Sequence, residues 1–237
     1  ASGNVIIKDS SRTANCGKAT YNRKDEITTL EIEPQIFDKD QILSGSKIIL
    51  KYKDEDLKEL NISKNAQAIT TIEGYKNIKN DSINFVDTLK FKNNIQGSKM
   101  TSFFDNGQLK LIQVEGMAKT LYHVFEDSIY VGKNNSSGDT IIMNFSDNSL
   151  DQININGGSK GEYIPDSLSN DVGSKINYSS DFIKYKLDSE ETDLRGNTQI
   201  KYEETDLEAG FITVNWRTGI LNAKPMAVWD SSINPIY

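Results

Sequence analysis

The stretch from Gly97 to Lys119, GSKMTSFFDNGQLKLIQVEGMAK, decides the fold class. Met100, Ser102 and Phe104 occupy alternate positions, so their side chains share one face of an extended strand. The run Asp105–Gln108 then supplies the Asp, Asn and Gly that tight hairpin turns favour. A second apolar run follows this turn. The stretch therefore predicts a β-hairpin.

Two further stretches, Gly45–Gln67 and Gly138–Lys160, repeat this pattern without a gap. Each begins with Gly, alternates apolar residues, turns at Lys53–Asp56 or Ser146–Ser149, and continues into a second apolar strand. In this register, fourteen side chains point to one shared face. They are Ile48, Leu50, Tyr52, Leu60 and Ile62 in the first copy, Met100, Phe104, Ile112 and Val114 in the second, and Ile141, Met143, Phe145, Ile153 and Ile155 in the third. Hairpins that recur in this way predict a stacked array, in which each hairpin buries its apolar face against its neighbours.

The second strand of each copy changes parity after its first Leu. Leu57 and Leu60, for example, are an odd number of positions apart, although both are expected to point inward. An extra residue in a β-bulge would return them to the same face. Residues 74–94 lengthen the interval between two of the copies, and we expect a longer loop or an added hairpin there.

Composition supports an elongated all-β chain. The 237 residues are 36% hydrophobic, which is lean for a compact globule of this length. No segment carries a sustained helical period, so almost no helix is expected. The net charge of −7 argues against nucleic acid as a partner, because phosphate binding needs clustered Lys and Arg. No apolar run reaches the length of a membrane-spanning helix.

We therefore predict an all-β, elongated solenoid of stacked antiparallel hairpins, with an ordinary β-sandwich as the alternative. Pro165 and the polar residues after it favour a break in the array. The expected organisation is a first part over 1–165, a linker or loop over 166–179 and a continuation over 180–237. The start at Ala1 already reads as a strand entry, and we expect an upstream export segment to have been removed.

Two long stretches resemble a known family. Val114–Asp166, VEGMAKTLYHVFEDSIYVGKNNSSGDTIIMNFSDNSLDQININGGSKGEYIPD, is similar to the OstA-like proteins and to the N-terminal domain of LptD-type outer-membrane assembly proteins. Ser180–Pro225, SDFIKYKLDSEETDLRGNTQIKYEETDLEAGFITVNWRTGILNAKP, resembles another unit of the same OstA/LptA/LptD-type lipopolysaccharide-transport family. The opening SGNVII and the run GKATY at 17–21 fit more loosely.

The resemblance implies a β-jelly-roll or taco-like solenoid that shields lipid acyl chains in the periplasm. It implies no catalytic residue and no cofactor. The partners would be lipopolysaccharide or a similar amphiphile, and other jelly-roll proteins joined end to end through edge strands, with self-association by the same route. We expect those edges near Ser2–Lys8 and Gly210–Leu221. The fourteen register positions given above are the expected lining of the lipid groove. The chain could be a bridge protein or the outer-membrane-attached part of a longer one.

The sequence gives little support for a catalytic site or a metal site. Cys16 is the single cysteine, placed by its neighbours in a turn or at a strand edge, and His123 is the single histidine, within an expected strand. A zinc site needs three or four ligands, and no loop has the spacing of an EF-hand. Two rivals stay open: a β-helical polysaccharide-active enzyme, and a scaffold or adhesin solenoid whose core is fully packed. A carrier must leave its interior accessible, whereas a scaffold fills it.

Overall fold

The computed structural model describes residues 1–8, 12–80, 83–147, 149–168, 173–216 and 218–225. In this part of the chain there are fifteen strands, which form one hydrogen-bonded sheet, and no helix. The all-β fold and the stacked hairpins expected from the sequence are confirmed.

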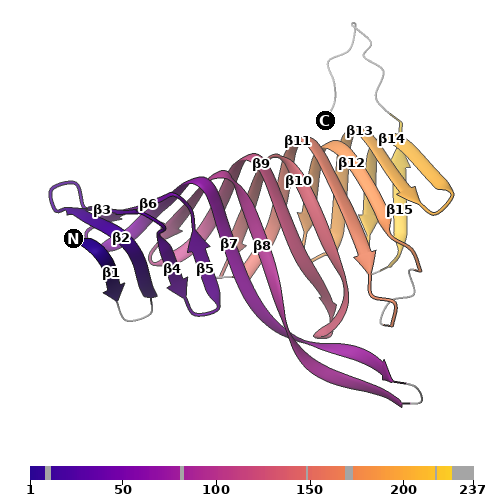
Figure 1. The fold of residues 1–237 in the computed structure, drawn as a ribbon. Helices are drawn as coiled ribbons and strands as arrows, with labels where there is room; N and C mark the ends of the chain where they lie inside the picture. The colour runs from indigo at the N-terminus through magenta and orange to yellow at the C-terminus, as the bar shows by residue number, and fades with distance from the viewer. Residues whose placement is uncertain (9–11, 81–82, 148, 169–172, 217, 226–237) are drawn as a thin grey trace, which may run out of the picture.

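The strands follow the chain almost in order across the sheet. They are β1 (Ser2–Lys8), β2 (Arg12–Asn22), β3 (Ile27–Glu31), β4 (Gln35–Asp38), β5 (Gln41–Ser44), β6 (Lys47–Lys53), β7 (Asp56–Asn80), β8 (Ile83–Asp105), β9 (Gln108–Glu126), β10 (Ile129–Ser146), β11 (Ser149–Pro165), β12 (Ile176–Lys186), β13 (Glu191–Tyr202), β14 (Thr205–Asn215) and β15 (Ile220–Lys224). Sequential strands pair antiparallel from β7 to β15, so the molecule is a rod with β1 near one end and β15 at the other (Figure 1).

The sheet is folded over along its length, because most long strands bend in the middle (Figure 1). We call layer A the part that holds β3, β6, β15 and the strand segments paired in line with them. Layer B holds β4, β5 and the other ends of the long strands. The ladder between β8 and β9 is interrupted at this corner, between Gln96 and Lys99, and the ladder between β10 and β11 is interrupted between Ser137 and Thr140. Both layers therefore belong to one continuous sheet.

The glycine that opens each sequence repeat lies at this corner. A Cβ atom at Gly97 would stand 2.5 Å from Cγ1 of Val114, and one at Gly138 would stand 2.5 Å from Cγ2 of Ile155. A Cβ at Gly45 would likewise collide with Ile62. The next strand's β-branched side chain thus occupies the space that a larger residue would need. The repeated Gly marks a close approach of neighbouring strands.

The hairpin turns and bulges are confirmed. Lys53 pairs with Asp56 around a two-residue turn whose φ angles are 54° and 68°, as a type I′ turn requires. The equivalent pairs close the turns at Asp105–Gln108 and Ser146–Ser149, although Asn148 lies outside the described residues. Beside the first turn, Tyr52 pairs with Leu57 and Lys51 with Glu59, which leaves one bulged residue between the two pairs. Corresponding shifts occur in the other two copies.

Within 74–94, residues 74–80 and 83–94 form an added hairpin, since the pairing of β7 with β8 continues to Asn80 and Ile83. This extension leaves the stack and runs beneath the hairpins that follow it (Figure 1). It is held there by Phe91, which stacks on Tyr130 with 4.9 Å between ring centroids, and by a 2.9 Å ion pair from Lys76 to Asp166.

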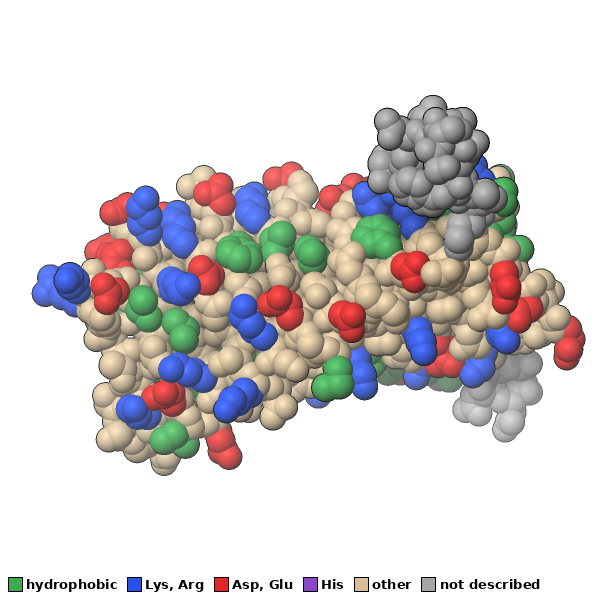
Figure 2. Space-filling model, turned by 90° about the horizontal axis from the view of Figure 1, so that it is seen from above, with side chains coloured by type: hydrophobic (Ala, Val, Ile, Leu, Met, Phe, Trp, Pro, Cys, Tyr) green, Lys and Arg blue, Asp and Glu red, His purple; other side chains and the backbone are tan. Residues whose placement is uncertain are grey.

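The core lies between the layers, and both contribute to it. Layer A supplies large side chains such as Ile62 and Met100, whereas layer B supplies small ones such as Ala66 and Ala118 together with large ones such as Ile95. On the face that Figure 2 shows, charged residues of both signs are interspersed.

Two local expectations are wrong. Cys16 lies inside β2 and is buried, because the sheet bends there and turns that side chain into the core. Among the described residues the C-terminal edge strand is β15, and the expected edge at 210–221 instead spans the end of β14 and the start of β15, because the chain turns back after Asn215. At the expected linker, β12 begins at Ile176 and pairs with β11, so the sheet continues across it. The division of the chain into parts stays a prediction.

Candidate functional site

The fourteen register positions all belong to the space between the layers. Eleven of them are buried members of one contiguous core: Ile48, Leu50, Leu60, Ile62, Met100, Ile112, Val114, Ile141, Met143, Ile153 and Ile155. Tyr52, Phe104 and Phe145 are partly buried and pack against that core. The repeat register therefore identified an inner face. The contact of these fourteen residues with lipid stays a prediction.

Exposure within this inner face increases from the corner to the open edge of the fold. Met100, beside the corner, is 0% exposed, whereas Phe104, next to the hairpin turn, is only partly buried. The same change occurs between Ile141 and Phe145 in the third copy. Apolar residues thus stay accessible along the line where the layers separate. Tyr52, Phe104 and Phe145, together with Leu109 and Leu150, form this partly buried row.

A cavity of about 430 Å³ opens between the layers at the N-terminal end of the rod. This volume lies within the range of small-molecule binding pockets. Leu50 and Tyr52 are the two predicted residues that line it. The other lining residues are Ala1, Val5, Ile7, Arg12, Ala14, Ala19, Thr20, Tyr21, Thr28, Leu30 and Ile36. Most of these side chains are apolar, and Arg12, at the rim, pairs with Asp38 at 2.8 Å.

The sequence reasoning missed most of this cavity. Apart from Leu50 and Tyr52 on β6, its walls come mainly from β1 to β4, where the repeat is short and irregular. The signal in the sequence was the alternation around Leu30 and the apolar run that contains Val5 and Ile7. Neither indicates that the space between the layers stays open there, because that depends on how far the short strands splay apart.

Further along the rod, a buried polar network joins the two layers. Tyr178 of layer B donates to Oδ1 of Asn134 at 2.6 Å, and its hydroxyl lies 2.5 Å from that of Tyr185 in layer A. Ser136 contacts the Tyr185 hydroxyl at 2.9 Å. Burial raises the pKa of both tyrosines, so both stay protonated at neutral pH. This network crosses the interior between β10 and β12.

The single Cys and His do not come together in one site. Cys16 lies in β2, while His123 lies in β9, half-buried, with Nδ1 3.0 Å from Oδ1 of Asn93. Burial, assisted by Lys133, lowers the pKa of His123. Among the described residues, no three His, Cys, Asp or Glu side chains gather as a metal site would need. The described part of the chain also has no helix long and apolar enough to cross a bilayer.

Comparison with known proteins gives a likeness among solved structures. No family model matches the chain, and no curated protein matches its sequence. Among solved structures, it is similar to LptH of Pseudomonas aeruginosa, described as the LptA homologous periplasmic component of the conserved lipopolysaccharide transport device. The identity is 15%, the match covers 56% of this chain and 82% of that one, and the TM-score is 0.44. At this identity the likeness concerns the fold alone.

Proposed function

We propose that the protein is a non-enzymatic carrier that shields the acyl chains of lipopolysaccharide, or of a similar amphiphile, between its two layers in the periplasm. The observation that carries the proposal is the apolar cavity at the N-terminal end, which shares Tyr52 with the partly buried residues at the open edge. The family resemblance of Val114–Asp166 and Ser180–Pro225 supports it.

The physical basis is the burial of apolar area. An acyl chain that enters the cavity would cover Leu50 and Tyr52, and each Å² of apolar surface removed from water contributes about 25 cal/mol. The interaction is non-directional, so a chain can slide along the row toward Phe104 without breaking specific bonds. The sugar and phosphate groups of the amphiphile stay in water at the open edge. No cofactor is required for such transfer.

The edge strands supply the route to partners in this proposal. β1 pairs only with β2, and β15 pairs only with β14 among the described residues. Each leaves backbone donors and acceptors for a further strand. Other jelly-roll proteins, or a second copy of this chain, would dock there and extend the groove. Attachment to the outer membrane as part of a longer protein belongs to the same proposal.

A scaffold solenoid is the second candidate, and the packed interior favours it. Ile62, Val114 and Ile155 are 0% exposed, and the tyrosine network fills the space further along. If this packing does not yield, only the N-terminal cavity and the open edge can hold an acyl chain. The two candidates therefore differ in whether an amphiphile reaches the inner face.

Site-directed photo-crosslinking tests the proposal. A photoreactive amino acid at Tyr52 or Phe104, incubated with purified lipopolysaccharide, should capture it after illumination. The matched positions Lys51 and Lys99 are the outward neighbours in the same strands and should capture little. Lipopolysaccharide stripped of its acyl chains should not crosslink at any of the four positions.

The outcomes separate the candidates. Absence of capture at both inward positions, with a folded protein by circular dichroism, supports the scaffold and contradicts the carrier. Equal capture at inward and outward positions indicates surface adsorption and also contradicts it. Capture at Tyr52 alone would confine the lipid to the N-terminal cavity.

A further inference from the structure

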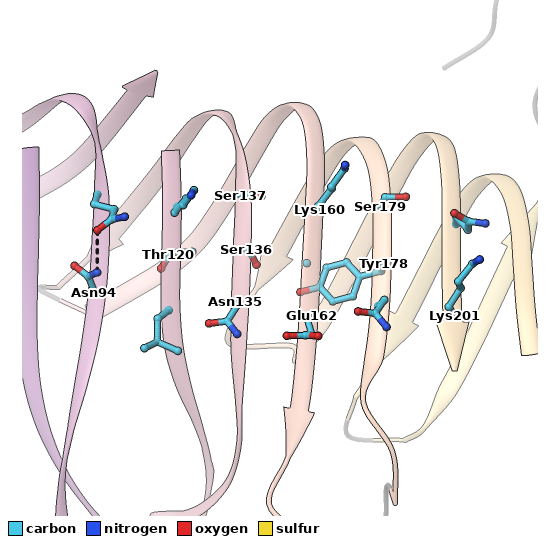
Figure 3. A pocket seen from close by; sticks show the side chains of 16 residues that line it. Asn94, Thr120, Asn135, Ser136, Ser137, Lys160, Glu162, Tyr178, Ser179 and Lys201 are labelled. Atoms are coloured by element: carbon cyan, nitrogen blue, oxygen red, sulfur yellow. Dashed lines mark hydrogen bonds between the residues drawn. The ribbon is translucent and has the colours of Figure 1, made fainter. Parts of the chain in front are cut away.

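A trough of about 620 Å³ lies on the outer face of layer B, away from the core. It crosses β8 to β13, above the added hairpin. Most of its lining side chains alternate with the buried ones of the same strands. Figure 3 shows Ser137, Lys160 and Ser179 in one row, with Asn94, Asn135 and Glu162 in a second row below it. Strand pairing aligns these rows: Ser137 pairs with Lys160, and Lys160 pairs with Ser179.

The trough is lined mostly by polar side chains, and several of them are free to bind a partner, whereas Asn94, Gln96 and Gln199 already bond to neighbouring side chains. The side chains of Asn135, Asn177, Ser137 and Ser179 make no hydrogen bond to any described residue. Amide and hydroxyl groups both donate and accept, so each can bind a partner of either kind. Leu121 is the one aliphatic side chain in the lining, and Tyr178 is the one aromatic residue there.

Its charge differs from that of the whole protein. Lys119 and Lys160 have no ion-pair partner within the described structure, although the chain carries a net charge of −7. The single lining carboxylate, Glu162, is neutralised by Lys175 at 3.0 Å, and Lys201 is paired with Asp206 at 3.1 Å. Two uncompensated positive charges therefore remain. Ser137 pairs with both residues and lies between them, so their strands are roughly 10 Å apart.

We propose that this trough binds an acidic oligosaccharide. Such a chain presents anionic groups, which Lys119 and Lys160 would pair with, separated by hydroxyls, which Ser137 and Asn135 would bind. The chemistry that selects it is the combination of unpaired charge with unpaired donors and acceptors on one rigid sheet face. The site is separate from the space between the layers, so it does not depend on lipid carriage.

The test is calorimetric titration with a hexamer of galacturonate. A phosphorylated oligosaccharide freed of lipid tests the other source of negative charge, and maltohexaose is the neutral control. We expect saturable binding of at least one acidic chain and none of maltohexaose. The variant K119Q/K160Q should bind about tenfold more weakly. The matched variant K51Q/K99Q removes the same charge from the outer face of layer A and should bind as the original protein does.

A second variant keeps the charge unchanged. Changing Asn135 and Asn177 together to Ala should weaken binding severalfold, with circular dichroism confirming the fold. If neither acidic oligosaccharide binds saturably, the proposal is wrong. Equal losses in K119Q/K160Q and K51Q/K99Q would show general electrostatic attraction and overturn it. Equally tight binding of hexaglutamate would indicate an acidic peptide site and overturn it too.

Discussion

Gly138 illustrates how one missing Cβ atom shapes this molecule. The backbone conformation does not require glycine at this position, because the φ angle of Gly138 is not in the left-handed region. The reason is the neighbouring strand: a Cβ at Gly138 would lie 2.5 Å from Ile155 Cγ2 and 2.9 Å from the Asn156 carbonyl oxygen. A contact with backbone cannot be relieved by turning a side chain. The close approach at the corner therefore requires glycine there.

Gly138→Ala should lower the free energy of unfolding by about 1–3 kcal/mol, as overpacking does in other cores. Denaturant unfolding followed by circular dichroism measures the change. Gly173→Ala is the matched control, since nothing lies within 4 Å of the added Cβ, and it should stay within about 0.5 kcal/mol of the original protein. Similar losses at both positions would contradict the steric explanation of the repeated Gly.

At the scale of elements, β1 and β15 each pair with a single strand among the described residues. Each also exposes an apolar side chain: Ile6 is 62% exposed in β1 and Ile220 is 55% exposed in β15. An open edge with apolar residues invites another strand, and a charge placed on it blocks such pairing. Both features favour contact with a further chain at the ends of the rod.

We expect concentration-dependent self-association in sedimentation velocity, weakened when Ile220 is changed to Lys. Val86→Lys is the control, because Val86 is equally exposed at 55% but lies on the added hairpin, away from the terminal edges. A strict monomer at high concentration would refute self-association. Equal effects of the two variants would show that the contact does not use the edge strand.

The whole molecule is a one-dimensional array in which each strand contacts its neighbours and stability varies along the rod. The middle, from β8 to β11, has long strands and an inner face that is fully buried beside the corner. The N-terminal end has short strands and an open cavity. Opening of this end disrupts fewer contacts, so it should occur more often.

Hydrogen exchange measured by mass spectrometry should therefore show faster amide exchange in β1 to β4 than in the corner segments of β8 to β11. Added lipopolysaccharide should slow exchange in β1 to β4 if acyl chains occupy the cavity. Uniform exchange along the rod would contradict the gradient. Protection confined to the middle strands would place the lipid elsewhere.

The sequence by itself determined the hairpins. Alternation at Met100, Ser102 and Phe104, the turn residues after them and the parity change at each Leu are local features. They fixed the turns, the bulges and the inner face because strand side chains alternate strictly and tight turns restrict the backbone. The Gly that opens each repeat is also visible in the sequence. The reason that glycine is needed there is not, because the atom with which a Cβ would collide belongs to the adjacent strand.

Only the tertiary structure decided how the two layers meet. The cavity at the N-terminal end depends on the splay of β1 to β4, and the Tyr178–Tyr185 contact depends on two strand halves facing each other across the core. The polar trough depends on six strands lying in register, so that Lys119 and Lys160 come near each other from different hairpins. Each of these features joins residues far apart in the chain. Their relative positions follow from packing between layers and from sheet twist, which no local pattern of residues encodes.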